Sequence, residues 1–520
     1  MKQRTWYYVV GFLFATVLLG FWVGLDDVFM KSPQSAHLWR QTDCAGLARN
    51  YYYDGLDFWQ PRMMNTFGKD GRSVGEFPIT YYLAGCLYAL FGQPHEGLMR
   101  MLHCLFFVSG CLGFSLIIRG VSGHWLPGMG FGLLLVSSPL LLFYSFNFLV
   151  DAPAFGVLLW GWYALWRFTD GRRFGWLLFA MLAICLAGLL KVTLLVTWVA
   201  LVILYLVERL GLVQLLGNHK MFDNSLKTIA AFFIPPVFSA IWYSWAGYYN
   251  AIHSPYLLME LMPIWKVDAD FRDKIWHRIT HDWHWSYMHP MFSLPTLTAA
   301  LWVMLTPRKH APFLYGTVVL CVFGAISLAI LWFEQLYHHD YYAIAWMILP
   351  CSVWITASAW LTKKWPKIWQ KWWIYLVFIA AVAFSANHVR NVIAFRYNPT
   401  EGFMKGFPQV MYDKTRLQNF LRKNGLVRQQ RVISVPDGSP NASLYLYDLT
   451  GLTYYSFAEN RKYLPADSIV NWAARGYNYL LVFDRPAVLK DTLMQKTMRH
   501  PIDSLDDAIF LYDLRPLKNE

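Results

Sequence analysis

The sequence predicts a polytopic α-helical membrane protein that ends in a soluble α/β domain. Of its 520 residues, 56% are hydrophobic and only 15% are charged, whereas globular proteins carry roughly 25% charged residues. Apolar runs long enough to cross a bilayer recur up to about residue 386. After residue 387 the composition becomes that of a soluble domain. We therefore expect a membrane domain over residues 1–387 and a soluble domain over residues 388–520.

The charge pattern and the cysteines exclude several classes of protein. The net charge of +13 comes from short basic clusters between apolar runs, as in the cytoplasmic loops of membrane proteins, so we expect membrane lipids and no nucleic acid as partners. Six of the seven cysteines lie in apolar segments, and only Cys44 lies in a polar one. Their spacing predicts neither a disulfide framework nor a zinc-type cluster.

A polar insert over residues 37–78 follows the first apolar run, residues 6–25. No small-residue cleavage site follows that run, which predicts a retained span that starts in the cytoplasm and an insert on the far side. Residues 79–91 are short for a span and rich in aromatics. If they crossed the membrane, three later basic clusters would lie outside, against the positive-inside rule. We therefore expect an interfacial helix there and a first outer loop over residues 25–100.

About eleven spans follow from hydropathy and length. We expect them near residues 6–25, 101–118, 126–146, 152–168, 176–190, 192–206, 229–248, 294–305, 313–333, 342–361 and 373–386. The polar turns that carry acids then share the outer face with the insert, and the basic clusters share the inner face.

The last part of the chain alternates helical and strand patterns. Helices are predicted at 415–424 and 465–475, and strands at 431–435, 453–457, 479–483 and 508–512. No glycine-rich phosphate loop or catalytic cluster is present in this part, so we expect a cap or an acceptor-handling domain. Asn441 to Ser443 fit the N-glycosylation pattern, which three residues match easily by chance.

Several scattered motifs in the membrane part carry a family resemblance. They are Trp39 to Asp43 with Ala48 to Asn50, Glu76-Phe77-Pro78, Val150 to Pro153, Gly188 to Lys191, and His338 to Tyr342. Together with the large first outer loop and the soluble tail, they resemble the GT-C glycosyltransferases. Within that group the chain is most similar to the bacterial relatives of protein O-mannosyltransferases and of the aminoarabinose transferase that modifies lipid A.

The resemblance implies transfer of a sugar from a polyprenyl-phosphate donor to a hydroxyl of a lipid, a glycan or a protein. It implies that Asp43, Glu76 and Asp151 are catalytic and converge on one cavity. Arg40, Arg49, Lys191, His339, Asp340 and Tyr342 would bind the donor phosphate or sugar. A carboxylate can take the acceptor proton, and cations can meet the charge of the leaving phosphate. The expected location is the bacterial inner membrane, with the site and the C-terminal domain periplasmic.

One motif departs from the family pattern. Arg40 and Gln41 stand where the family has an acid pair, so the base is assigned to Asp43, about one turn later, although Asp26 and Asp27 also precede the loop. Phe77 replaces a lysine of the aminoarabinose enzyme. Structural roles stay open for the acids, since Asp43 could cap a helix and Asp151 could face a helix dipole.

The histidines and the class of activity leave alternatives open. Imidazole and carboxylate groups are suitable metal ligands, so a divalent metal ion stays open as a cofactor. The histidines concerned are His277, His281, His284, His289, His338 and His339. They match no fixed metal motif, however, and tryptophans interleave with them. The alternative function is a transporter or flippase of lipid-linked sugars, which would show paired internal repeats that we do not find.

Overall fold

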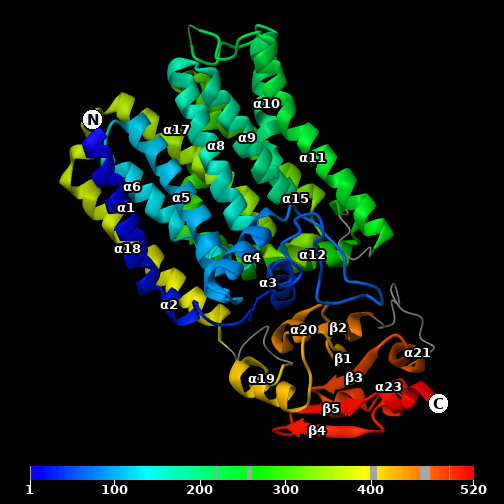
Figure 1. Ribbon diagram of the computed structural model, residues 1–520. Coiled ribbons are helices and arrows are strands. Elements are labelled where there is room, and N and C mark those ends of the chain that lie inside the picture. The colour runs from blue at the N-terminus through cyan, green and yellow to red at the C-terminus, as the bar shows by residue number, and fades with distance from the viewer. Residues whose placement is uncertain are drawn as a thin grey trace. The chain divides into compact units, whose positions relative to one another are not determined.

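The computed structural model describes residues 2–519 except 35, 218, 254–260, 399–406, 457–468 and 491. The chain divides into two compact units, each built from several segments (Figure 1). The first contains Met1–Phe29, Arg100–Ser244 and Met259–Phe395, and the second contains Met30–Met99, Trp245–Leu258 and Arg396–Glu520. We call them the helical unit and the mixed unit.

The helical unit is built almost entirely of helices. They are α1 (Lys2–Trp22), α2 (Leu25–Val28), α5 (Glu96–Ser122), α6 (Trp125–Val136), α7 (Pro139–Ser145), α8 (Asp151–Gly171), α9 (Phe174–Leu190), η1 (Val192–Leu195), α10 (Val196–Arg209), α11 (Leu226–Ile252), α12 (Ala269–His277), α13 (His284–Tyr287), α14 (Pro290–Leu305), α15 (Pro312–Leu331), α16 (Gln335–His338), η5 (Asp340–Met347), α17 (Ile348–Lys364) and α18 (Trp372–Arg396). The first residues of α5 and the last of α11 and α18 belong to the mixed unit.

Among the described residues, seven helices are long and apolar enough to cross a membrane, or up to nine if each of two bent pairs is one span. Each of the eleven predicted segments overlaps helix, although segments 6–25, 126–146 and 313–333 run past observed helix ends. The two that are neither among the seven nor in a bent pair lie in α8 and in the shorter apolar helix α9. The chain is therefore a multi-pass membrane protein, and the predicted boundary after residue 387 falls inside α18.

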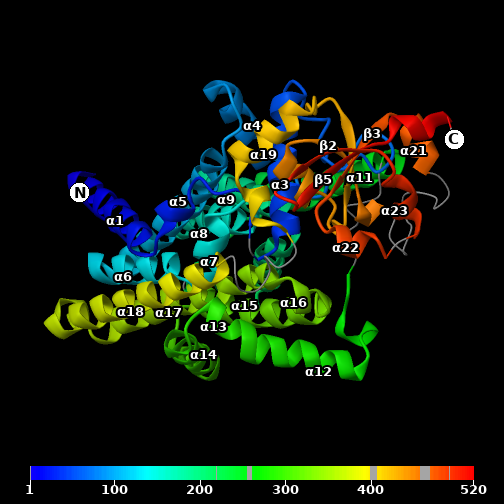
Figure 2. The ribbon, with the colours of Figure 1, turned by 90° about the horizontal axis from the view of Figure 1, so that it is seen from below.

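One predicted span needs correction because it is bent, and a second lies in one arm of a bent pair of helices. Segment 126–146 is not one helix, since α6 and α7 meet at 68°. Pro139 begins α7, and proline both lacks an N–H group and disfavours a helical residue before it. Segment 294–305 lies in the second arm of a pair of helices bent by 103°, and Pro290 is the first residue of that arm. Figure 2 shows α12 and α14 running in different directions. The prolines that cause both bends lie at the first position of the second helix.

Close backbone approach fixes α8 against its neighbour α5. A Cβ atom on Gly110 would lie 2.1 Å from the carbonyl oxygen of Gly156, so the two helices touch backbone to backbone at this point. Small residues allow such contacts between membrane helices, where dispersion forces dominate association. The consequence is a fixed position for the first turn of α8, which begins at Asp151.

The mixed unit begins with two helices of the polar insert, α3 (Leu38–Tyr53) and α4 (Ile79–Phe91). A Cβ atom on Gly85 would lie 2.8 Å from the Cβ atom of Tyr51, so α4 packs directly on α3. With 13 residues, α4 is about 20 Å long, short of the roughly 30 Å hydrocarbon core of a bilayer. These dimensions suit an interfacial helix better than a span.

The C-terminal part of the mixed unit is a five-stranded mixed sheet with strand order β2-β1-β3-β5-β4. Strands β1 and β2 and strands β1 and β3 are parallel, whereas β5 is antiparallel to both β3 and β4. The elements are α19 (Lys414–Lys423), β1 (Arg431–Val435), α20 (Ala442–Tyr447), β2 (Thr450–Thr453), α21 (Ile469–Ala474), β3 (Tyr477–Val482), α22 (Arg485–Val488), α23 (Thr492–Thr497), β4 (Pro501–Leu505) and β5 (Ile509–Asp513).

The predicted α/β character of this part is confirmed, with two differences in its elements. Strand β2 ends at Thr453, where segment 453–457 was expected to begin, and β4 was not predicted because it is a polar edge strand with little apolar alternation. Of the predicted helix 465–475, the first residues lie outside the described part, and the rest contains α21.

A short segment of the polar insert joins the edge of this sheet. Asn65 forms an isolated parallel bridge with Gly451 of β2. The N–H of Thr66 donates to the carbonyl of Gly451 at 2.8 Å, and the N–H of Gly451 donates to the carbonyl of Met64 at 3.1 Å. The insert and the C-terminal sheet are therefore parts of one compact unit.

Candidate functional site

Three predicted site residues of the mixed unit lie together. Arg40 and Asp43 are one turn apart on α3 and so share a face of the helix, with 3.9 Å between Arg40 Nη1 and Asp43 Oδ2. Arg40 Nη2 also donates to Glu76 Oε1. One guanidinium thus stands between two carboxylates, and its charge offsets the repulsion between them.

Gln41, two residues before Asp43, anchors the first turn of α3. Gln41 is fully buried, and its Nε2 donates to the carbonyls of Gln34 and Ala36, each at 2.8 Å. These bonds join the helix to the chain that enters it. The neighbouring Cys44 thiol is also buried; burial raises its pKa to about 12, so it is a packing residue and not a nucleophile.

Asn441 is a site residue that the sequence analysis missed. Its Nδ2 donates to Asp43 Oδ1 at 2.6 Å, and its Oδ1 accepts from the N–H of Asn65 at 2.8 Å. The second bond fixes which end of the amide faces the carboxylate. Asp43 is 2% exposed and Asn441 is fully buried, so the carboxylate has a defined orientation. The sequence signal at this position was only the N-glycosylation pattern.

A second group of predicted residues lies in the helical unit. Lys191, at the C-terminal end of α9, places its Nζ 2.8 Å from Oδ1 of Asp151, at the start of α8. The two side chains are 10% and 4% exposed. The same ammonium lies 4.7 Å and 4.5 Å from the ring centroids of Tyr341 and Tyr342. The Lys191 ammonium thus lies between a carboxylate and two aromatic rings.

Asp340 and His339 lie beside these tyrosines. The hydroxyl of Tyr144, from α7, donates to Asp340 Oδ1, and Asp340 is 2% exposed. The ring of His339 stacks on that of Tyr341 with centroids 5.2 Å apart. Tyr144 was not predicted as a site residue, because a tyrosine in an apolar segment gives no signal distinct from core packing. Tyr341 lies inside the predicted motif His338 to Tyr342 but was not named as a ligand.

Two buried polar residues of α5 hold the turn that leads into α8. Arg100 is fully buried, and its Nε donates to the carbonyl of Phe146 at 3.2 Å while its Nη1 donates to that of Phe29 at 3.0 Å. His103 Nδ1 lies 3.2 Å from the carbonyl of Asn147. Burying an ionisable group in the membrane part costs free energy, so such a group usually has a specific role. Here Arg100 and His103 hold the turn that precedes Asp151.

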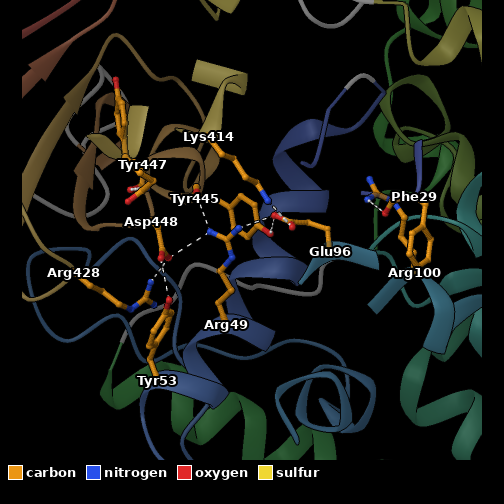
Figure 3. Close-up of polar contacts among 11 residues, drawn as sticks. Phe29, Arg49, Tyr53, Glu96, Arg100, Lys414, Arg428, Tyr445, Tyr447 and Asp448 are labelled. Atoms are coloured by element: carbon orange, nitrogen blue, oxygen red, sulfur yellow. Dashed lines mark hydrogen bonds and ion pairs between the residues drawn. The ribbon is translucent and has the colours of Figure 1, made fainter. Parts of the chain in front are cut away.

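Arg49 belongs to a different network from Arg40 (Figure 3). Its Nη2 donates to Glu96 Oε1 at 2.7 Å, its Nη1 donates to the carbonyl of Tyr445 at 2.9 Å, and Asp448 Oδ1 lies 3.4 Å from Nη1. Lys414 Nζ reaches the other oxygen of Glu96 at 2.6 Å. Burial acts to lower the pKa of Arg49, but the facing groups, Tyr445, Asp448 and Glu96, raise it overall. The guanidinium is thus neutralised within the mixed unit.

The described residues contain no group of three or more histidine, cysteine, aspartate or glutamate side chains placed to hold a metal ion. In the segment between α11 and α14, His277 and His281 stack on each other with ring centroids 4.3 Å apart. His289 contacts the rings of Phe384 and His388. These imidazoles contact other rings and do not converge on one point, so they are not placed to share a metal ion.

Apart from Arg49, the predicted site residues thus form two groups, each within one unit. The mixed unit holds Asp43 and Glu76 on either side of Arg40, and the helical unit holds Asp151, Lys191, Asp340 and the tyrosines. Each group combines a carboxylate that can accept a proton with a cation that can meet a phosphate. The convergence of Asp151 with Asp43 and Glu76 stays a prediction.

Comparisons with known proteins identify the fold as that of the GT-C glycosyltransferases. It is similar to ArnT from Cupriavidus metallidurans in the apo state, with a TM-score of 0.62 and 12% identity over 99% of both chains. ArnT bound to undecaprenyl phosphate gives the same score and identity over 98% of both chains. The apo oligosaccharyltransferase of Archaeoglobus fulgidus gives 0.56 at 10% identity, over 94% of this chain and 71% of that one.

No protein-family model and no curated protein matches the chain in sequence. At the identities given above, the structural similarity defines the fold and leaves the activity to be argued from the side chains.

Proposed function

We propose that this protein is a glycosyltransferase that moves a sugar from a polyprenyl-phosphate-linked donor to a hydroxyl group of a lipid, a glycan or a protein. The fold supports this proposal because it matches ArnT, which has been solved with undecaprenyl phosphate, over nearly the whole of both chains. The proposed location is the periplasmic face of a bacterial inner membrane.

The observation that carries the proposal is the Asp43, Arg40 and Glu76 group. The acceptor oxygen forms a bond to the anomeric carbon while the bond from that carbon to the phosphate oxygen breaks. The acceptor proton passes to a carboxylate, for which Asp43 is the candidate because Asn441 orients it. The phosphate leaves with the bonding electrons, and Arg40 is the nearest cation of this group to meet its charge.

The Asp151 and Lys191 group is the second part of the proposal. Lys191 can exchange its carboxylate partner for a phosphate oxygen, and the flanking tyrosine rings together with His339, Asp340 and Tyr342 can line a sugar. We leave Arg49 out of the donor site because Glu96 and Asp448 already neutralise its guanidinium. Glu76 keeps a catalytic role as the second carboxylate on Arg40.

The test is glycan and glycolipid mass spectrometry in a strain that lacks the protein, followed by complementation with variants. We expect one missing sugar and an accumulated polyprenyl-phosphate donor. Asp43→Asn, Glu76→Gln and Asp151→Asn should each lower transfer by about 100-fold or more, the scale of general acid–base catalysis. Asp54→Asn and Asp282→Asn are matched controls, because these acids are exposed and lie in the same two units.

Full activity of all three variants, at normal protein levels, would remove the proposed site. The flippase alternative gives a different result with purified protein in vesicles: labelled donor lipid would change leaflet intact, without release of free polyprenyl phosphate.

A further inference from the structure

A cavity of about 550 Å³ lies inside the helical unit, between α8, α10, α15 and α17. It opens where several helices begin or end: Thr169 is close to the end of α8, and Lys363 is close to the end of α17. Asp151 begins α8, 18 residues before Thr169, a distance of about 27 Å along the helix. The cavity mouth and the Asp151 group therefore lie at opposite ends of the helical unit.

The wall of the cavity is mostly apolar. Leu165, Leu201, Leu204, Leu320 and Ile355 contribute to it. Along α17 it extends from Ile348 to Lys363, about 22 Å, which compares with a hydrocarbon core roughly 30 Å thick. Its depth and lining suit an extended hydrocarbon chain that reaches more than halfway across the membrane.

The mouth of the cavity is basic. Arg308, Lys309, His310 and Lys363 line it, and among the described residues no aspartate or glutamate does. Arg308 and Lys363 are exposed, and within the described part of the chain no carboxylate forms an ion pair with either. His310 has its Nε2 3.1 Å from Thr306 Oγ1, while its buried Nδ1 has no hydrogen-bond partner among the described residues. These groups are donors for an anion.

We propose that this cavity binds one anionic phospholipid, with its phosphate on the basic mouth and an acyl chain in the apolar part. Basic pockets between membrane helices are suited to anionic lipid head groups, and an apolar wall of this length shields an acyl chain from water. The chemistry at the mouth favours a phosphate over a neutral or zwitterionic head group. The site does not depend on the proposed transferase activity.

The competing occupant is a polyprenyl phosphate. Thr197 Oγ1 and Trp162 Nε1, deeper in the wall, are buried without a partner in the described residues, so the deep end is not wholly apolar. The four basic side chains at the mouth outweigh these two groups in placing the phosphate there.

The test is native mass spectrometry of the full chain, purified in detergent and mixed with phosphatidylglycerol, phosphatidylethanolamine or undecaprenyl phosphate. We expect one phosphatidylglycerol per protein, bound in preference to the other two lipids. The double variant Arg308→Ala, Lys363→Ala should bind it about 30-fold more weakly, as expected for the loss of two interfacial cations. Ala359→Phe, which fills the cavity without a change of charge, should also weaken binding.

The matched control is Arg173→Ala, Lys364→Ala. It removes the same two charges near helix ends of the same unit, but neither residue lines the cavity, and Lys364 packs on the rings of Trp360 and Trp365. Equal binding of phosphatidylglycerol by this control and by the Arg308, Lys363 variant would overturn the proposal. Preference for undecaprenyl phosphate would also overturn it, in favour of a prenyl-chain site. Size-exclusion profiles check that each variant is folded.

Discussion

Asp43 and Asn441 are 398 residues apart in the chain and are joined by a 2.6 Å hydrogen bond. Because the amide oxygen of Asn441 is occupied by the N–H of Asn65, its Nδ2 is held toward the carboxylate. The residue just before α20 thus orients the carboxylate of Asp43 in the candidate site.

We expect Asn441→Ala to impair transfer by freeing the Asp43 carboxylate. Loss of a hydrogen bond to a charged group costs roughly 1.5–3 kcal/mol, which corresponds to a fall in kcat of about 10- to 100-fold. The KM for the donor should change little, since Asn441 touches no proposed phosphate ligand. Steady-state kinetics of the purified variant measure both parameters. An unchanged kcat at normal thermal stability would contradict the positioning role.

The sequence put forward candidate acids but not the residues that position them. Asp43, Glu76 and Asp151 were proposed on the family resemblance, and for Asp151 the cost of an ionisable group at membrane depth added to it. Asn441 carries no such cost by itself, and its partner lies outside any local window. For Arg49, the arginine side chain suggested a phosphate contact. Its actual partners, Glu96 and Asp448, could be known only from the fold.

At the scale of elements, the Arg49 network fastens α3 to the first turn of α5 and to the end of α20. The guanidinium also lies 3.7 Å above the ring centroid of Tyr445. Because α3 carries Arg40 and Asp43, this network holds the helix on which the site is built. Its two carboxylates, Glu96 and Asp448, would lose a buried cation if Arg49 were replaced.

Arg49→Ala should therefore destabilise the protein by about 3–5 kcal/mol, the usual cost of removing one partner of a buried pair. Arg40→Ala should destabilise the protein less than Arg49→Ala, because Arg40 is more exposed, yet it should abolish most transfer. Thermal unfolding in detergent, compared with transfer rates, separates the two arginines. A stable but inactive Arg49→Ala variant would instead restore Arg49 to the donor site.

The elements show which parts of a fold local patterns can predict. Apolar length placed each of the eleven predicted segments on helix for most of its length, and strand 431–435 was predicted with its observed bounds. The bends at Pro139 and Pro290 were missed because hydropathy averages over a proline. The bridge between Asn65 and Gly451 was also missed, since an isolated pairing of a loop with a sheet edge has no periodicity to detect.

At the scale of the whole molecule, the basic loops of the helical unit gather at one end. The cavity is lined by Thr169, Gly217, Arg308 and Lys363, which belong to four different connections or helix ends. Arg172 Nη1 also donates to the carbonyl of Lys220 at 3.2 Å.

The positive-inside rule then assigns this end to the cytoplasm and predicts the orientation of the chain. A periplasm-active reporter inserted after Arg173, Lys309 or Lys364 should be silent, and the same reporter inserted after Asp413 should be active. The same result at Arg173, Lys309 and Lys364 tests whether these three loops lie on one side of the membrane. The contrast with Asp413 tests which side that is. Activity at Arg173 together with silence at Asp413 would invert the orientation and place the Asp151 group in the cytoplasm, where a periplasmic transferase could not use it.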